Sequence, residues 1–173
     1  QGTHRVEGEA AAEVDPAERT TLVGHESLLL GAPPSLTLTE LAQRAGTSME
    51  VAQKFWRAMG FADVQPDEVR FTDQDVAALQ DTVALLDETS DSSLASASVL
   101  ELLRAQSYTM DRLVLWELET FVMDLSERLG LDDTAARLVA LDRIDGLVEL
   151  LSRQLTYVWR RHMASILGRT DAE

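Results

Sequence analysis

The fold is decided by a stretch in the first half of the chain, residues 36–61, which reads LTLTELAQRAGTSMEVAQKFWRAMGF. A capping box that starts at Thr37 opens a first helix, and Gly46 ends it. A similar box starts at Thr47 and opens a second helix, which ends at Gly60. Two short helices joined by a turn that contains glycine predict a helix-turn-helix.

Helix signals of the same kind continue along the chain. Asp15 followed by Pro16 has the form of an N-cap with proline at the first helical position, and the consecutive prolines Pro33 and Pro34 must end that helix. From Val99 onward, apolar residues recur every three or four positions, and no convincing run in the chain alternates with a period of two. We therefore expect an all-α fold. The predicted helices occupy residues 15–28, 40–45, 49–59, 73–87, 99–129 and 132–167.

Three places in this pattern are left open by the sequence. The connector over 62–70 has room for a small hairpin, and the polar residues Ser107 and Thr109 allow an interruption of the long helix. Gly146 allows a break in the last helical region.

A segment rich in serine and alanine, residues 89–98, is typical of a linker and divides the chain into two small helical subdomains. We expect residues 1–35 to form a lead-in, which is polar over residues 1–13, together with a short helix. Residues 36–89 should form a helix-turn-helix subdomain. Residues 90–173 should form a C-terminal subdomain for dimerisation and ligand binding. The first residue is Gln1 rather than methionine, which favours a piece taken from a longer protein.

The composition excludes several classes of protein. The 173 residues carry a net charge of −15 and include no cysteine. Such a charge argues against nucleic acid as a partner, because Lys and Arg supply most of the non-specific affinity for phosphates. The lack of cysteine excludes disulfides and thiolate metal sites. No run approaches the roughly 18 apolar residues of a membrane span, and no signal peptide is visible, so we expect a cytoplasmic protein.

Residues 36–61, followed by FTDQDVAAL at 71–79, resemble two families. One is the helix-turn-helix head of MerR-type regulators, which share the ELA and GTS motifs, the GF exit and a following helix of this type. The other is the N-terminal regulatory domain of the actinobacterial pH-sensing class III adenylyl cyclases, which contains a similar pair of helices.

The rest of the chain favours the cyclase family. LELLR at 100–104, a second amphipathic stretch and WRRHMA at 159–164 resemble the cyclase regulatory domain in order and spacing, and the resemblance covers about residues 36–168. It implies an α-helical homodimer that precedes a catalytic domain absent from this chain, modulates that domain with pH, and holds a fatty acid in its apolar interior. The chain before Leu36 is shorter and less patterned than the family's N-terminal helices.

A MerR-like transcription regulator with a hydrophobic effector-binding domain is the alternative. The second helix of the pair offers Lys54 and Arg57 as its cations and also carries Glu50, and acids crowd the segment that follows. This surface would mostly repel a DNA duplex. We therefore expect the helix pair to be structural or to bind protein. Its expected core anchors are Phe55, Trp56 and Phe61.

The apolar stripe from Val99 to Leu125 has two interpretations. Periodicity alone favours an ordinary core. The family resemblance adds the hypothesis of a lipid cavity, in which an arginine such as Arg112 or Arg104 meets the carboxylate of a fatty acid. The residues predicted to bind lipid are Leu103, Met110, Arg112, Trp116, Phe121 and Met123.

The C-terminal stretch 150–170 carries four arginines and no acid, which stands out in so acidic a chain. Cations near the C-terminus of a helix complement the helix dipole, which is one explanation. The other is a transmission helix whose basic face meets acidic groups of the catalytic domain expected after Glu173. The residues assigned to it are Arg153, Arg160, Arg161 and Met163.

A seam of apolar residues, spaced by three and four, predicts a partner helix. Its members are Leu141, Ile144, Val148, Leu151, Leu155 and Val158. His162 takes the next position, and Arg161-His162-Met163 matches the corresponding segment of the cyclase family. Because histidine changes charge nearest to neutral pH, we predict that His162 is a pH switch, with the direction of the response left open. A histidine without such a role is the alternative.

No catalytic residue is predicted in this chain. It contains neither a G-x-x-x-x-G-K-[ST] phosphate loop nor an H-E-x-x-H motif, and its three histidines are too scattered for a metal site. The metal-binding aspartates of a class III cyclase have no counterpart here. We expect no cofactor and no metal, apart from a bound fatty acid.

Overall fold

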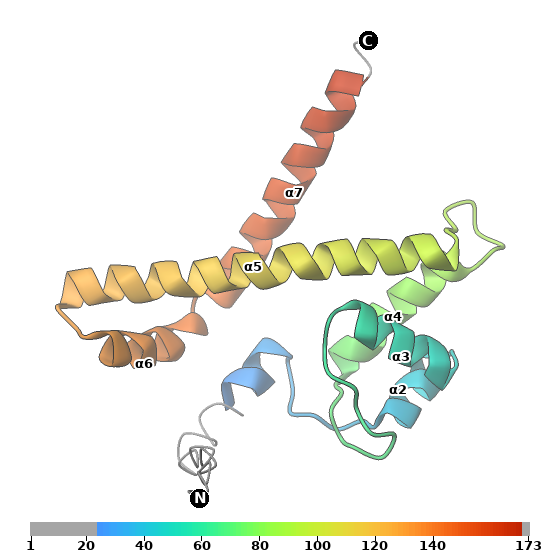
Figure 1. Cartoon of the computed structure of the whole chain (residues 1–173), viewed down its shortest axis with the longest axis horizontal. Coiled ribbons are helices and arrows are strands. Elements are labelled where there is room, and N and C mark those ends of the chain that lie inside the picture. Colours follow the sequence, from blue (N-terminus) through green and yellow to red (C-terminus); the bar gives the residue numbers. More distant parts are fainter. Residues whose placement is uncertain (1–23, 171–173) are drawn as a thin grey trace, which may run out of the picture.

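The computed structural model describes residues 24–170, and this part of the chain is all-α, as predicted (Figure 1). A short helical segment at 24–29 is followed by longer helices. These are α2 (Leu38–Ala45), α3 (Met49–Ala58), α4 (Asp73–Leu86), α5 (Ser96–Leu129), α6 (Asp133–Ile144) and α7 (Val148–Thr170). The expected N-cap at Asp15 and the polar lead-in over 1–13 lie outside the described residues.

Side-chain caps fix where several helices begin. Thr37 and Glu40 form the predicted capping box of α2: the Thr37 hydroxyl accepts from the Glu40 amide at 3.3 Å, and the Glu40 carboxylate accepts from the Thr37 amide at 2.8 Å. α3 is capped one residue later than predicted, because Ser48 accepts from the amide of Val51 at 3.2 Å. Asp132 caps α6, as the sequence indicates.

The first hydrophobic core lies between α2, α3 and α4. A single bridge closes it, in which the amides and carbonyls of Leu36 and Phe71 exchange hydrogen bonds of 2.9 and 3.0 Å. The buried residues of this cluster are Leu36, Leu38, Leu41, Ala42, Ala45, Ala52, Phe55, Val64, Phe71, Val76 and Leu79. The expected pair of short helices is thus present and packed.

The small hairpin that the connector over 62–70 had room for does not form. Side chains of α3 hold this loop instead: the Trp56 indole donates to the carbonyl of Ala62 at 2.8 Å, and the Arg57 guanidinium binds Asp63. The expectation that Phe61 anchors the core is also wrong, since its side chain is 52% exposed. It lies against the outer side of Trp56, with ring centroids 4.5 Å apart.

α5 runs unbroken for 34 residues, so the interruption allowed near Ser107 and Thr109 is absent. The hydroxyl of Thr109 donates to the carbonyl of Ala105 at 2.9 Å within the helix, and the hydroxyl of Ser107 donates to α3. α5 also begins at Ser96, inside the predicted linker.

α5 spans the described part of the molecule, as Figure 1 shows. Its first half packs on α3 and α4, and its second half packs on α6. The core between α5 and α6 is small. Its buried residues are Val122, Leu125, Ala136 and Ala140.

The last helical region is broken next to Gly146, at the place that the sequence left open. α6 ends at Ile144, and α7 begins at Val148 and extends away from the body of the molecule (Figure 1). None of the α7 residues that the structure describes is buried. The Nδ1 atom of His25, in the short N-terminal helical segment, lies 3.4 Å from the Asp145 carboxylate in the turn before α7.

Among residues 24–170, no helix combines the length and the apolar character that crossing a membrane requires.

Candidate functional site: a groove between α3 and α5

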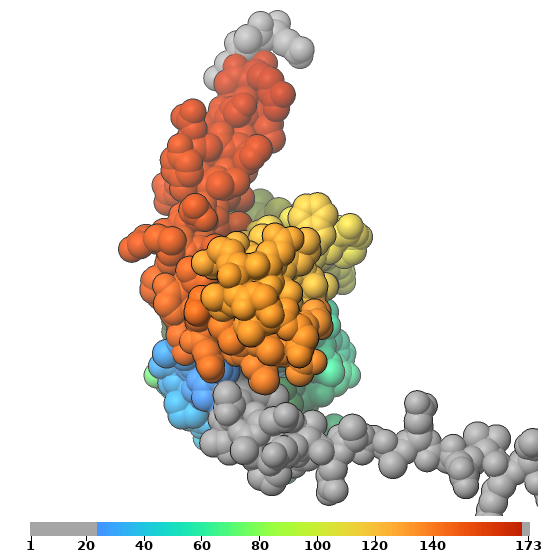
Figure 2. All heavy atoms as spheres, turned by 90° about the vertical axis from the view of Figure 1, so that its left-hand side faces the viewer, coloured from blue at the N-terminus to red at the C-terminus, as the bar shows by residue number. Residues whose placement is uncertain are grey.

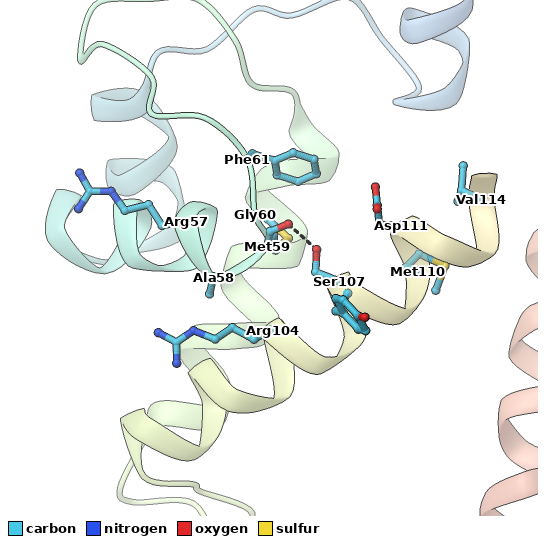
Figure 3. Close-up of a pocket in the computed structure, with 11 residues that line it drawn as sticks. Arg57, Ala58, Met59, Gly60, Phe61, Arg104, Ser107, Met110, Asp111 and Val114 are labelled. Atoms are coloured by element: carbon cyan, nitrogen blue, oxygen red, sulfur yellow. Dashed lines mark hydrogen bonds between the residues drawn. The ribbon is translucent and has the colours of Figure 1, made fainter. Parts of the chain in front are cut away.

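A groove of about 810 Å³ lies where the end of α3 meets the middle of α5 (Figure 3). Its volume falls within the range of roughly 300–1,000 Å³ that is typical of small-molecule sites. The last turn of α3 and the segment after it contribute Arg57, Ala58, Met59, Gly60 and Phe61, and α5 contributes Arg104, Ser107, Tyr108, Met110, Asp111 and Val114. The groove therefore depends on how the two helical parts of the chain are joined.

One hydrogen bond fastens the two walls together. The chain leaves α3 through Gly60, whose φ of 82° is in the left-handed region that favours glycine. This turn exposes the carbonyl of Met59, which accepts a hydrogen bond from the hydroxyl of Ser107 (Figure 3). Backbone carbonyls at the end of a helix need such partners, so Ser107 both ends α3 and positions α5.

Much of the groove surface is apolar. Phe61 stacks on Trp56 on the α3 side, and Met110 and Val114 are both partly exposed on the α5 side. Figure 3 shows the Phe61 ring standing across from the α5 residues. An apolar chain could lie against Phe61, Met110 and Val114 on this surface.

The charges of the groove are separated along its length. In Figure 3, the guanidinium groups of Arg57 and Arg104 point to one end, and Asp111 and Val114 lie at the other. Arg57 binds Asp63 through two hydrogen bonds, of 2.6 and 3.1 Å. These bonds lower the pKa of the Asp63 carboxyl below its ordinary value and raise the pKa of Arg57. Arg104 is paired as well, with the Glu101 carboxylate at 3.2 Å. An anion at this end of the groove would therefore have to replace Asp63 or Glu101 as the partner of an arginine, and Asp111 disfavours an anion at the opposite end.

The residues predicted to bind lipid do not line one cavity within a single chain. Each step along an α-helix turns by about 100°, so Leu103, Met110 and Phe121 fall on one face of α5. Arg112, Trp116 and Met123 fall on the opposite face.

The burial of these residues agrees with that division. Leu103 packs against the first core and lines a narrower cleft of about 50 Å³ beside α4. Phe121 packs against the second core, and Met110 lines the main groove. On the other face, Trp116 is 75% exposed, and Arg112 and Met123 are exposed as well.

Sequence reasoning missed several groove residues, among them Met59, Ser107 and Tyr108. Helical spacing offered a signal for Ser107, because it lies between Leu103 and Met110 on the face that packs on α3. A polar residue in an apolar stripe indicates a hydrogen-bond partner on the facing element, rather than the interruption that we inferred. The sequence did not indicate which group at the end of α3 would accept the hydrogen bond from Ser107.

α7 carries all the residues assigned to the transmission helix. The side chains of Arg153, Arg160, Arg161 and Met163 are exposed. Along the helix, Leu151, Leu155, Val158 and His162 share one face, and Arg153 and Arg160 lie on the opposite one. Arg161 lies at the flank of the predicted seam, so the arginines of α7 do not gather on one separate face.

His162 lies on the apolar face of α7 and is exposed in the single chain. The break at Gly146 divides the predicted seam, so that Leu141 and Ile144 belong to α6 and the other members belong to α7. A partner helix on the α7 face would cover His162 together with Val158.

Comparison with known proteins relates the chain to one class of enzyme. No model of a known protein family matches it. It is 35% identical over 171 residues to an adenylate cyclase from Streptomyces coelicolor, covering 97% of this chain and 43% of that protein. It is 32% identical over 158 residues to an adenylate cyclase from Glutamicibacter nicotianae, covering 91% of this chain and 38% of the relative.

A third adenylate cyclase, from Streptomyces griseus, is 32% identical over 158 residues, which are 90% of this chain and 38% of that protein. The chain therefore spans about two fifths of the length of the curated relatives that it matches. Nearly all of this chain is related to a part of proteins named adenylate cyclase.

Proposed function

We propose that this chain is the N-terminal regulatory part of an adenylate cyclase, that it forms a homodimer, and that it responds to pH and to a fatty acid. The catalytic domain would follow Glu173 and form cyclic AMP from ATP. Support comes from relatives that are more than twice as long as the matched segment and carry the name of that enzyme.

The observation that carries the proposal is the amount of apolar surface that α5 and α7 leave exposed. Tyr157, Val158 and Trp159 on α7 and Leu115 and Trp116 on α5 belong to this surface. Large exposed apolar patches mark interaction sites. The packing of α5 against α6 buries only a small core and leaves this apolar surface exposed. A second copy of the chain would bury them.

In this proposal, α7 connects the regulatory part to the catalytic domain. The helix has 23 residues and extends from the body of the molecule (Figure 1). Its exposed arginines would meet acidic groups of the catalytic domain, and His162 would change its charge on the face that a partner covers. A change in pH would thereby alter how α7 is held.

A chimera tests this proposal. This chain would replace the matched segment of the Streptomyces coelicolor adenylate cyclase, and cyclic AMP formation would be measured from about pH 5.5 to about pH 8, where histidine changes its charge. We expect the chimera to change its activity with pH, and the same cyclase without the matched segment to follow a different profile. Identical profiles for the two proteins would overturn the regulatory role.

Two further measurements use the chain alone. Light scattering at tens of micromolar should give about twice the 19.1 kDa of a single chain. Incubation with ATP should give no cyclic AMP. A monomer in the first measurement would remove the proposed homodimer, and turnover in the second would contradict a regulatory part without catalytic machinery.

A further inference from the structure

One face of α5 carries large apolar side chains that no described part of the chain covers. Tyr108 is 68% exposed, Trp116 is 75% exposed and Met123 is 61% exposed, and Leu115 lies beside them. At about 100° per residue, these side chains form one stripe, which borders the groove with α3 at Tyr108 and leaves Trp116 and Met123 uncovered by either α3 or α6. In Figure 2, the central part of α5, drawn in yellow, projects on the side of the molecule away from α7. We call these residues and the charged residues between them the outer face of α5.

The residues of the outer face are arranged symmetrically about a midpoint. At equal distances on either side of it stand residues of similar size or of opposite charge. This midpoint lies between Leu115 and Trp116, the two apolar residues at the centre of the outer face. Three positions before Leu115 stands Arg112, and three positions after Trp116 stands Glu119. Both side chains are exposed, and their charges are opposite.

The correspondence continues further from the midpoint. Seven positions outward on either side stand Tyr108 and Met123, both large and exposed. Eleven positions outward stand Arg104 and Glu127, again exposed and opposite in charge. Arg104 also lines the groove with α3 and pairs with Glu101 of its own helix, so it stands at the edge of the outer face. A single helix gains nothing from such a pattern, because residues this far apart along it do not touch.

We propose that the outer face of α5 pairs in antiparallel orientation with the outer face of α5 from a second copy of this chain. The twofold axis would pass between Leu115 and Trp116. Residues equally distant from this point then face each other, so that Arg112 meets Glu119 of the second copy, and Glu119 meets Arg112 of the second copy. This pairing rests on the homodimer proposed above and specifies its interface.

Charge decides between the antiparallel and the parallel pairing. In a parallel twofold pair, each residue faces its own copy, which would place Arg112 against Arg112 and Glu119 against Glu119. Facing like charges disfavour a complex, whereas the antiparallel pair turns each of these contacts into an ion pair.

Both charged residues are already held in place within the single chain. The guanidinium of Arg112 lies over the Tyr108 ring, 5.7 Å from its centroid, and donates to the Tyr108 hydroxyl at 3.1 Å. Glu119 accepts from Arg137 of α6 at 3.1 Å. Side chains that are already ordered lose less conformational entropy when a complex forms.

The pairing has a definite extent. From Arg104 to Glu127, a helix rises about 35 Å at 1.5 Å per residue, so the shared face covers most of α5. The two helical subdomains around α2, α3 and α4 then lie at opposite ends of the pair.

Cysteine substitutions test the register, since the chain contains no cysteine of its own. In the proposed pair, position 108 of one copy faces position 123 of the other, at a separation suited to a disulfide. The 173-residue chain with both Tyr108→Cys and Met123→Cys should form a covalent dimer under mild oxidation. Within one helix these positions are about 22 Å apart, too far to link to each other.

The single variants are the matched controls. Positions 108 and 108 of the two copies are also about 22 Å apart in the antiparallel pair, so neither Tyr108→Cys alone nor Met123→Cys alone should form a linked dimer. Efficient linking of the Tyr108→Cys single variant would show a parallel pair and overturn the proposal.

The homodimer and its register can fail separately. If light scattering shows a dimer but the double cysteine variant gives no linked product, the register is wrong and the homodimer stands. If the unmodified chain is a monomer, both the homodimer and the proposed register are wrong.

A charge reversal gives a second measurement that needs no oxidation. Arg112→Glu would place two carboxylates together at two symmetric points, and should raise the dimer dissociation constant at least about tenfold. Lys54→Glu changes the charge of the chain by the same amount on the exposed surface of α3, outside the outer face, and should leave the constant within about twofold. Equal effects of the two variants would contradict the proposed contact.

Discussion

Phe71 holds the first core together from a position outside any helix. Its side chain is 0% exposed, its ring meets Trp56 edge-on at 5.0 Å, and its backbone pairs with Leu36. We expect Phe71→Ala to lower the free energy of unfolding by about 3–5 kcal/mol, because it leaves a cavity among α2, α3 and α4. Urea denaturation followed by circular dichroism measures this.

Phe61 provides the matched control for that substitution. It is also stacked on Trp56, but its side chain faces the groove and is half exposed. Phe61→Ala should cost about 1 kcal/mol or less. Equal losses for the two variants would mean that the core is not centred on Phe71.

The contrast between these two phenylalanines shows what the sequence leaves undetermined for single residues. Phe61 and Phe71 both follow helix-ending or connecting segments, and residue type alone predicts burial for both. Which one is buried depends on the left-handed turn at Gly60 and on the bridge between Leu36 and Phe71. Those contacts are set by tertiary packing, so the sequence predicted the helix pair but placed Phe61 wrongly.

His162 carries a prediction about pH. It shares the apolar face of α7 with Leu155 and Val158, so a change of its charge would alter the packing of a partner on that face. In the chimeric cyclase, His162→Phe should flatten the dependence of activity on pH between about 5.5 and 8 relative to the parent. His25→Phe is the comparison, because His25 belongs to the helical segment at 24–29 and contacts Asp145 before α7, off the seam. A His162→Phe profile that superimposes on the parent profile would remove His162 from the mechanism.

At the scale of helices, the two glycines that follow α5 and α6 act differently. Gly130 has a φ of 62° and ends α5 in the left-handed conformation, whereas Gly146 is not among the residues with positive φ. Gly130→Ala should therefore destabilise the chain by about 1–2 kcal/mol, since an L-residue is strained there. Thermal unfolding measures the change.

The control for that prediction is Gly146→Ala. A Cβ added at Gly146 would lie 3.7 Å from the carbonyl oxygen of Arg143, which is an ordinary contact. We expect this variant to be neutral or more stable by up to about 1 kcal/mol, because alanine restricts the unfolded chain. A larger loss at Gly146 than at Gly130 would contradict the assigned helix ends.

The helices were predicted well where local signals decide them, and poorly where tertiary contacts do. The capping box at Thr37, the cap at Asp132 and the end at Gly130 all act within one turn of helix, and each was readable. The continuity of α5 through Ser107 could not be predicted, because it depends on the distant carbonyl of Met59. For the same reason, the place of Ser107 in the apolar stripe indicated a partner on a facing element but not the groove that forms around that contact.

At the scale of the whole molecule, the charges of α3 argue against duplex DNA as a partner. Lys54 lies 3.0 Å from Glu50, and Arg57 is bound by Asp63, so both cations of this helix are paired within the chain. We expect no sequence-specific complex in gel shift experiments, because pairing phosphates would require breaking these contacts. A salt-sensitive complex of nanomolar affinity with one sequence would favour the transcription-regulator alternative.

We propose the groove between α3 and α5 as the place where a fatty acid would bind. Its alkyl chain would lie against Phe61, Met110 and Val114, and its carboxylate would replace Asp63 or Glu101 as the partner of Arg57 or Arg104. We expect native mass spectrometry of the purified chain to show a bound long-chain fatty acid, or added oleate to raise the melting temperature.

Two substitutions locate that ligand, because the residues predicted to bind lipid lie on opposite faces of α5. Met110→Gln places an amide in the groove and should weaken oleate binding about tenfold or more, since an apolar chain cannot satisfy the amide. Trp116→Ser changes the outer face and should leave the affinity for oleate within about twofold at a protein concentration where both variants have the same oligomeric state. The opposite order of effects would place the lipid on the outer face of α5, at the interface between two copies. Bare polypeptide in the mass spectrum, together with no effect of oleate on the melting temperature, would rule out fatty acid as a ligand of this chain.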